Sequence, residues 1–362
     1  MRVEKPRLYW VVGELSGENH ALGLLRALQE RLPQAEHRGM GGPRMAELGV
    51  SLVANWEAYA VVGFVEVVRH LGRFVGLYRQ LLRDIAQWRP HRVILVDYPG
   101  LNLRLARRLI RQGIPVTYFI PPQVWAWNTQ RVRYLRHPLI QVLVILPFEV
   151  EFYARHGVQA VYVGHPLVEQ LRDLPPFEAD EPFIALLPGS RETEVRQLLP
   201  RMAQLAGRMP EWRFYVSQVP HLPQTLYERL APNLPRFVGP APALLKAAAA
   251  AVVASGTASL EAALLGCPSV IAYRGSWVSY WIARSLVRVP YIGLPNLILG
   301  RRVFPELIQG KCTPQALQQA LREVLQCREA IRAELVQLQQ ALGSLSASET
   351  AAEYIVRTLQ GA

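Results

Sequence analysis

Two kinds of residue in this 362-residue sequence stand where chemistry is often done: a carboxylate that ends an apolar run, and small polar residues that open a helical segment. The run VILV ends at Asp97, and the run AAVVA ends at Ser255-Gly256-Thr257. At the carboxyl end of a parallel strand, a carboxylate can serve as general base for a hydroxyl group. The N–H groups of a helix N-terminus can bind an anion. Alternatively, both features only satisfy neighbouring backbone groups.

Further polar residues extend the anion site. In LPGSRETEV, Arg191 projects from a turn at Gly189 and Ser190, and an arginine there could bind a diphosphate with two hydrogen bonds. Glu261 lies one helical turn beyond Thr257 and suits ribose hydroxyls. Together these residues favour a pocket for a nucleotide diphosphate.

Sugar-binding candidates lie nearer the N-terminus. The turn within Val11–Gly23 is not a GxGxxG motif, so a dinucleotide site is not supported, whereas Glu14 and Ser16 suit sugar hydroxyls. In the loop Pro121–His137, Trp125 could stack on a sugar ring and Arg131 could hold a phosphate. The alternatives are a tight turn with Ser16 capping the helix, and a hydrophobic plug with exposed arginines.

Alternating strands and helices must position these residues. Helical patterns cover Asn102–Gln112, Thr193–Arg208 and Ser259–Leu265. The predicted strands are Leu8–Val12, Val93–Val96, Val116–Ile120, Val142–Leu146, Phe183–Leu187, Arg213–Val216, Ala251–Ala254 and Ser269–Ala272. This alternation predicts an α/β protein with two Rossmann-like domains facing a cleft. The acidic, proline-rich linker Arg172–Pro182 suggests an N-terminal domain over residues 1–172, a nucleotide domain over 173–313 and C-terminal helices over 314–362, which either pack back on the N-terminal domain or are exchanged in a dimer.

Composition narrows the class of protein. The net charge of +12 favours an anionic partner, although the arginine-rich composition could also reflect genome bias. No nucleic-acid-binding signature is present, so nucleic acid is not an expected partner. Three cysteines without CxxC pairing indicate neither a cysteine zinc site nor a disulfide framework. Since neither a signal peptide nor a transmembrane run is recognisable, we expect a cytoplasmic protein, or one bound to the membrane from that side.

One amphipathic segment could contact a membrane. Apolar residues recur at helical spacing from Phe64 to Ile85, and arginines form the polar side. The residues expected at a membrane surface are Val62, Phe64, Val68, Arg69, Leu71 and Arg73. The same pattern also fits a core-packing helix with solvated arginines.

In their order along the chain, these motifs resemble the lipid-A-disaccharide synthase family. The motifs are GELSGE, VGFVEV (Val62–Val67), VDYPGLN, VWAW, LPFE (Leu146–Glu149), VGHP (Val163–Pro166), LPGSRETEV, ASGTASLE and GLPNLILG (Gly293–Gly300). The resemblance implies a GT-B fold and an inverting transfer without metal or other cofactor. The donor would be UDP-2,3-diacylglucosamine and the acceptor 2,3-diacylglucosamine 1-phosphate (lipid X), in lipid A biosynthesis.

The resemblance also assigns roles to residues. Asp97 would be the general base for the acceptor 6-hydroxyl, and Arg191 would lie near the donor phosphates. Asn296 of the LPN motif would contact the nucleotide, and Glu66 of VGFVEV would join the acceptor side. Family members are peripheral proteins of the inner membrane, and some are homodimers with exchanged C-terminal parts.

Two positions depart from the family pattern. Glu18 stands where many relatives have the aspartate of SGD, and Gly100 stands where many have the second aspartate of DxPDFN. The loss at Gly100 leaves a non-catalytic lipid- or nucleotide-binding homologue as one alternative. Another GT-B enzyme that uses a UDP-sugar, either a MurG-like transferase or an epimerase, is the second.

Overall fold

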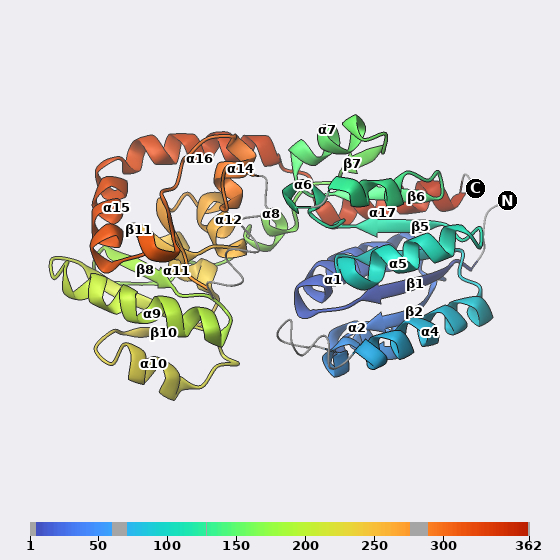
Figure 1. Ribbon diagram of the computed structural model, residues 1–362, viewed down its shortest axis with the longest axis horizontal. Helices are drawn as coiled ribbons and strands as arrows, with labels where there is room; N and C mark the ends of the chain where they lie inside the picture. Colours follow the sequence, from blue (N-terminus) through green and yellow to red (C-terminus); the bar gives the residue numbers. More distant parts are fainter. Residues whose placement is uncertain (1–4, 60–70, 128, 276–288, 361–362) are drawn as a thin grey trace. The chain divides into compact units, whose positions relative to one another are not determined.

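The chain forms two compact α/β units in the computed structural model (Figure 1). The structure describes residues 5–59, 71–127, 129–275 and 289–360. Unit 1 contains Met1–Pro166 and Leu345–Ala362, and unit 2 contains Leu167–Ser344. Each unit is a parallel sheet covered by helices on both faces, so the predicted α/β class is confirmed.

The sheet of unit 1 has seven strands within the described residues, in the order β3-β2-β1-β4-β5-β6-β7, and all its pairings are parallel. The strands are β1 (Arg7–Val12), β2 (Glu36–Gly41), β3 (Ser51–Asn55), β4 (Arg92–Val96), β5 (Val116–Phe119), β6 (Ile140–Val144) and β7 (Ala160–Tyr162). Since the chain order reverses beside β1, the carboxyl ends of β1 and β4 form the edge where such folds bind ligands.

Helices cover both faces of this sheet. Helices α4, α5 and α7 pack on one face, and α1 and α17 pack on the other. The bounds are α1 (Leu15–Arg31), α2 (Pro43–Glu47), α4 (Leu71–Trp88), α5 (Pro99–Ile110), α6 (Val124–Trp127), α7 (Pro147–Arg155), α17 (Ala347–Gln360) and the 3-10 helices η1 (Trp56–Tyr59) and η2 (Thr129–Leu135). The last helix of the chain therefore completes the first unit.

Unit 2 has six parallel strands within the described residues, in the order β10-β9-β8-β11-β12-β13. The strands are β8 (Phe183–Leu187), β9 (Arg213–Gln218), β10 (Arg236–Val238), β11 (Ala250–Ala254), β12 (Ser269–Tyr273) and β13 (Glu306–Ile308). The helices are α8 (Pro166–Gln170), which crosses the unit boundary, α9 (Glu192–Gly207), α10 (Gln224–Leu230), α11 (Ala241–Ala247), α12 (Thr257–Leu264), α14 (Leu294–Leu299), η3 (Gln309–Lys311), α15 (Pro314–Gln326) and α16 (Arg328–Leu342).

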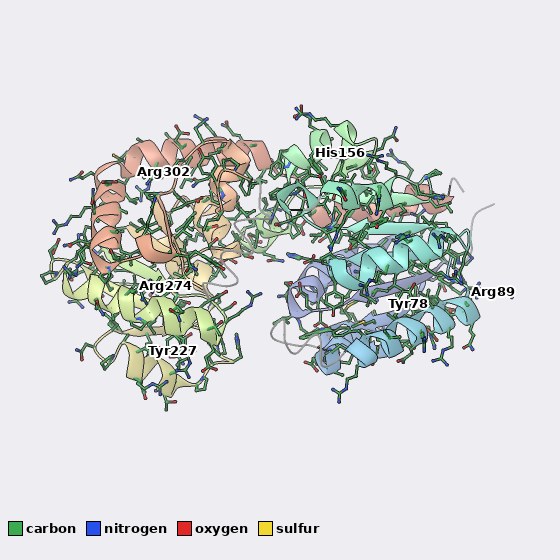
Figure 2. All side chains as sticks on the ribbon, in the orientation of Figure 1. Tyr78, Arg89, His156, Tyr227, Arg274 and Arg302 are labelled. Carbon is green, nitrogen blue, oxygen red and sulfur yellow. The ribbon has the colours of Figure 1, made fainter. Side chains whose placement is uncertain are left out.

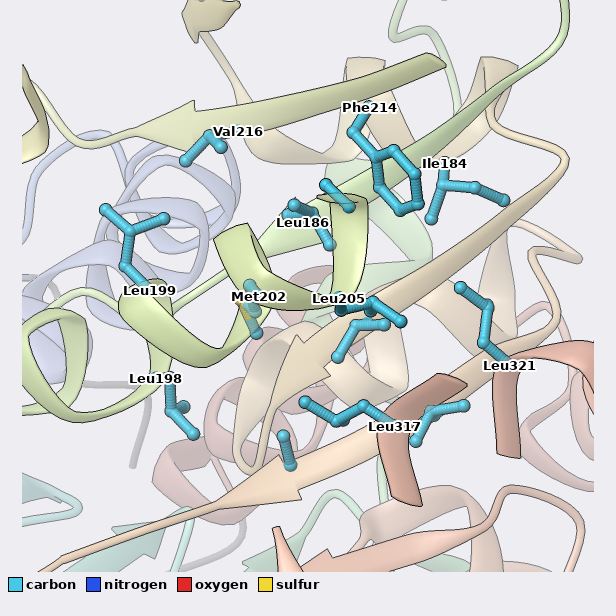
Figure 3. Close-up of a cluster of buried hydrophobic side chains, with 14 of the residues drawn as sticks. Ile184, Leu186, Leu198, Leu199, Met202, Leu205, Phe214, Val216, Leu317 and Leu321 are labelled. Atoms are coloured by element: carbon cyan, nitrogen blue, oxygen red, sulfur yellow. The ribbon is translucent and has the colours of Figure 1, made fainter. Parts of the chain in front are cut away.

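The core of unit 2 explains why its short apolar runs are strands. Every residue of β8 and β11 is buried, as expected for strands covered on both faces. Figure 3 shows Leu198, Met202 and Leu205 of α9 facing the strand residue Leu186 and Leu317 of α15. Truncating one such leucine to alanine typically costs about 2–5 kcal/mol, so this packing fixes the loops at the strand ends.

The described part of the predicted amphipathic helix packs partly into the core. Helix α4 begins at Leu71, and its Leu77, Leu81 and Ile85 are fully buried against the sheet. Arg73 and Val75 are exposed. The predicted residues from Val62 to Arg69 lie outside the described residues. Within those residues, no helix combines the length and the apolar character needed to cross a membrane.

Candidate functional site

Asp97 lies in an unusual turn directly after β4. Asp97 and Tyr98 both have φ near +47°, a left-handed conformation that costs a non-glycine residue about 1–2 kcal/mol. Two buried side chains hold this turn. The Asn102 amide donates hydrogen bonds to the carbonyl oxygens of Asp97 (2.8 Å), Val96 (3.2 Å) and Val11 (3.4 Å), and the Tyr118 hydroxyl donates to the Asp97 carbonyl (2.8 Å). The turn thus presents the Asp97 carboxyl group at the ligand edge of the sheet.

The environment of Asp97 holds its proton unusually tightly. Burial and the neighbouring Glu14 carboxylate, in that order, raise the pKa of Asp97 from 3.8 to about 7. Glu14 is exposed on the turn after β1, and its Oε1 accepts a hydrogen bond from the Ser16 hydroxyl at 2.9 Å. Three predicted residues, Asp97, Glu14 and Ser16, therefore form one polar group. A carboxyl group that titrates near neutral pH suits general-base catalysis.

Close packing fixes the turn after β1 against the turn after β4. A Cβ on Gly13 would come within 2.3 Å of the Tyr98 ring, so only glycine permits this contact. Glu18, which departs from the family pattern, is buried and accepts hydrogen bonds from the Met45 backbone N–H (3.1 Å) and the Trp56 indole (3.0 Å). Glu18 therefore anchors α2 to α1 instead of contacting a ligand.

The first tryptophan of the VWAW motif, Trp125, is held by an acid that the prediction did not include. The Trp125 indole donates a 2.9 Å hydrogen bond to buried Glu149, and its ring packs edge-on against Phe148 at 5.0 Å. Burial raises the pKa of Glu149 to about 7. Arg131 lies in η2, where its charge helps lower the pKa of Tyr134 after the larger effect of Arg133. Trp125 is thus anchored from within unit 1, and Arg131 belongs to a basic cluster.

The predicted phosphate-binding residues line one cavity in unit 2. The cavity has a volume of about 310 Å³ and is bounded by the ends of β8, β9 and β11 and the start of α12. Its walls include Gly189, Ser190, Arg191, Ser255, Gly256, Thr257 and Glu261. The first amides of α12 border this space and are suited to an anion. Burial raises the pKa of Glu261 to about 7, so near neutral pH this carboxyl group can donate or accept a hydrogen bond.

The Gly189–Arg191 turn leaves the arginine free to bind an anion. Gly189 has φ +108°, and a Cβ there would come within 2.4 Å of Glu194, so the position requires glycine. Glu194 accepts hydrogen bonds from the backbone N–H groups of Ser190 (3.2 Å) and Arg191 (3.3 Å). The Arg191 side chain is 75% exposed, and its contact with Glu194 is a loose 3.4 Å. A phosphate could therefore bind the Arg191 guanidinium by breaking only its weak contact with Glu194.

Asn296 has an internal role that the sequence did not suggest. Its side chain is fully buried and donates to the Phe304 carbonyl and to Glu306, both at 2.8 Å, while its oxygen accepts from Val303 and Phe304. Glu306 in turn accepts from the backbone N–H groups of residues 292 and 293 at 3.0 Å each. Ser255 lies 3.5 Å from the carbonyl oxygen of Ile292. Asn296 therefore supports the backbone beside the anion cavity.

Several site residues were not predicted from the sequence. Glu306, Glu194, Glu149 and Tyr98 act by holding other groups, and such roles leave no local sequence signal. His221 donates a 2.8 Å hydrogen bond from its Nε2 to the carbonyl oxygen of Ser190, a residue of the cavity wall. The predicted acceptor residue Glu66 lies outside the described residues.

Comparison with known proteins identifies the family. A family model described as lipid-A-disaccharide synthetase matches residues 8–357. The lipid-A-disaccharide synthase of Myxococcus xanthus (strain DK1622) is 39% identical over 98% of both chains, and that of Nitrosococcus oceani is 36% identical over 100% of this chain and 98% of the relative.

Solved structures confirm the predicted GT-B fold. The glycotransferase of kitacinnamycin has a TM-score of 0.71 at 18% identity and covers 98% of this chain and 99% of its own. UDP-GlcNAc 2-epimerase from Neisseria meningitidis has a TM-score of 0.60 at 11% identity, with 98% and 99% covered. On the family match, the chain belongs to the lipid-A-disaccharide synthases, glycosyltransferases of lipid A biosynthesis, and has their activity.

Proposed function

We propose that the chain transfers the sugar of UDP-2,3-diacylglucosamine to the 6-hydroxyl of 2,3-diacylglucosamine 1-phosphate with inversion at the anomeric carbon. The family supplies the reaction class, and the site residues supply the roles. The observation that carries the proposal is Asp97, a half-buried carboxyl group with a pKa of about 7 at the ligand edge of the unit 1 sheet. Such a group is ionised enough near neutral pH to accept a proton from a hydroxyl group.

In the proposed step, the acceptor O6 attacks C1 of the donor sugar. The C1–O6 bond forms as the bond from C1 to the diphosphate oxygen breaks, Asp97 takes the O6 proton, and UDP leaves with the bonding electrons. Arg191 and the N-terminal amides of α12 stabilise the negative charge on the departing diphosphate. Glu261 hydrogen-bonds the ribose, and Asn296 acts only by holding the 292–293 backbone.

A product assay tests this proposal. The enzyme is incubated with UDP-2,3-diacylglucosamine and lipid X, and mass spectrometry looks for the tetra-acylated disaccharide 1-phosphate together with UDP. We expect a single β-1,6-linked product from wild type and nearly none from Asp97→Asn, while UDP binding by that variant persists. A product with the retained anomer, or near-normal turnover by Asp97→Asn, would remove the proposed role of this residue.

We also propose that unit 1 works at the cytoplasmic surface of the inner membrane. The supporting residues are Arg73, which is exposed on α4, and Val75, an aliphatic residue of the same helix that is 42% exposed. Basic residues near an anionic surface contribute about 1 kcal/mol each. Co-sedimentation with phosphatidylglycerol vesicles, but not with phosphatidylcholine vesicles, is expected, and Arg73→Gln should weaken it. Equal binding to both vesicles would contradict this location.

The proposed homodimer rests on the family resemblance and on the last helix. Helix α17 buries Ala351, Ala352 and Ile355 completely against unit 1, and the same apolar contact would serve if two copies exchanged this helix. Sedimentation equilibrium is expected to give twice the monomer mass. A monomer at micromolar concentration would contradict the exchange.

A further inference from the structure

A cavity of about 650 Å³ lies between α4 and α5, next to the turn that carries Asp97. Its size is typical of sites for organic ligands. The residues of the turn and the start of α5 that line it are Tyr98, Gly100 and Leu101, which follow Asp97 directly in the chain. An occupant of this cavity would therefore lie beside the proposed general base.

One wall of the cavity is apolar. Helix α4 contributes Phe74, Val75 and Tyr78, of which Tyr78 also packs against the core of unit 1, and Figure 2 marks Tyr78 on this helix. Val75 is 42% exposed, so part of this wall is open to an incoming ligand. This wall suits a hydrocarbon chain.

The opposite wall carries four arginines. Arg104, Arg107, Arg108 and Arg111 are spaced by three and four residues, so they share one face of α5, and all four are exposed and line the cavity. In the described part of the chain, none of the ion pairs includes any of them. Arg107 only stacks on the Tyr134 ring at 4.5 Å.

Such a row of like charges is unfavourable for the helix by itself. Like-charged pairs at these spacings oppose helix formation, and no acidic side chain on α5 offsets them. A bound anion would reverse the effect, because a guanidinium group can donate two hydrogen bonds to one phosphate. An apolar wall facing an arginine wall matches a ligand that joins an acyl chain to a phosphate.

We propose that this cavity binds the acceptor, an acylated sugar phosphate, with an acyl chain along Phe74, Val75 and Tyr78 and the phosphate on the arginine face of α5. This inference rests on the proposed function and adds the residues that select the acceptor. Arg104 and Arg108 are the main phosphate ligands, because Arg107 is already engaged by Tyr134. The acceptor 6-hydroxyl then faces Asp97.

The phosphate assignment is tested by substrate discrimination. We compare kcat/KM for two acceptors, short-chain lipid X and the same diacylglucosamine without its phosphate. The enzymes are wild type, the double variant Arg104→Gln/Arg108→Gln and the control Arg26→Gln/Arg79→Gln. Arg26 and Arg79 are exposed helical arginines of the same unit that do not line the cavity. We expect the double variant to lower the phosphate preference by about 10-fold to 100-fold, and the control pair to keep it. Loss with both acceptors alike would overturn the assignment.

The acyl wall is tested at Gly100. A Cβ at Gly100 meets open space, so Gly100→Leu places its side chain toward the cavity without a backbone clash. The ratio of kcat/KM for a long-chain acceptor over a butyryl acceptor should fall about 10-fold, whereas Gly207→Leu, an exposed helical glycine of α9 with open space, should keep it. An unchanged ratio in Gly100→Leu would place the acyl chain elsewhere.

Three outcomes separate the possible failures. If wild type does not convert lipid X at all, the proposed function fails. If wild type converts it and neither ratio changes, only the acceptor site fails. If the arginines instead contact anionic membrane lipid, the double variant loses binding to phosphatidylglycerol vesicles while its phosphate preference stays at the wild-type value, and that result refutes the proposal.

Discussion

Glu14→Gln removes one negative charge beside Asp97 and keeps a side chain of nearly the same size. In the wild type, the Glu14 carboxylate is the next cause after burial for the raised pKa of Asp97, about 7. Without that charge, the ionised form of Asp97 becomes easier to reach. The acidic limb of the pH profile of kcat/KM should therefore move to lower pH.

The exposure of Glu14 sets the size of this effect. Two unit charges about 4 Å apart interact by about 4 kcal/mol near a protein surface and by about 1 kcal/mol in water. Because Glu14 is exposed, the lower value applies, and about 1 kcal/mol corresponds to a displacement of somewhat less than one pH unit. Burial still keeps the pKa of Asp97 above its ordinary value, so the limb does not return to the acid range of a free carboxyl group.

The assay is kcat/KM from pH 5 to 9 for wild type, Glu14→Gln and Ser16→Ala. Ser16→Ala removes the hydroxyl that donates to Glu14 but leaves both carboxylates, so it serves as the matched control and should keep the wild-type limb. If Glu14 also contacts the acceptor, the plateau at high pH falls in Glu14→Gln while the limb still moves. A wild-type limb below pH 5, or an identical limb in Glu14→Gln, would refute the electrostatic reasoning.

Four other measurements test the site. Because the pKa of Asp97 is raised, the stability that its proton provides is present below about pH 4 and is lost as the pH rises to about 7. Asp97→Asn should therefore raise the free energy of unfolding at pH 8 by about 2–4 kcal/mol and change it little at pH 4. Denaturant titrations at the two pH values measure this difference. Arg191→Ala should weaken UDP binding by about 10-fold to 100-fold in calorimetry, and unchanged affinity would place Arg191 away from the diphosphate. Asn296→Ala should lower the unfolding free energy by about 2–4 kcal/mol, because it leaves the backbone N–H groups of Val303 and Phe304 without their acceptor and removes one donor from Glu306, and an unaltered melting temperature would contradict that internal role. Turnover should be unchanged by EDTA, and its loss with recovery on adding Mg²⁺ would show a metal requirement.

The strand ends were predictable because their sequences combine several signals. The run before Asp97 and the run before Ser255 are apolar, short and followed by helical patterns, and each proves to be a fully buried central strand. Their central position in each sheet brings the polar residues after them to the ligand edge. Local pattern and global fold agree at these two places, so sequence reasoning found them.

Other parts depend on contacts that the sequence does not display. Strand β2 contains glycine and charged residues, and β3 has only three apolar residues and no fully buried one, so neither has the long apolar run of a buried central strand. The role of Asn296 requires knowing that β13 brings Glu306 to it. The arginine face of α5 indicates a ligand site only together with the apolar residues of α4. Those residues lie at least 26 positions earlier in the chain than Arg104, so the local sequence does not show the combination.

The hydrogen bonds that hold the Asp97 turn have a practical consequence for engineering. Asn102 and Tyr118 both bind the carbonyl oxygen of Asp97, and the conformation of the turn is therefore set by main-chain atoms. The turn should therefore keep its backbone conformation when the side chain at position 97 is changed. Asparagine, which tolerates left-handed conformations well, should fit at this position with the loop unmoved. Changing this one residue should therefore give an inactive enzyme that holds both lipid substrates, because the change removes the proton acceptor and leaves its surroundings as they were.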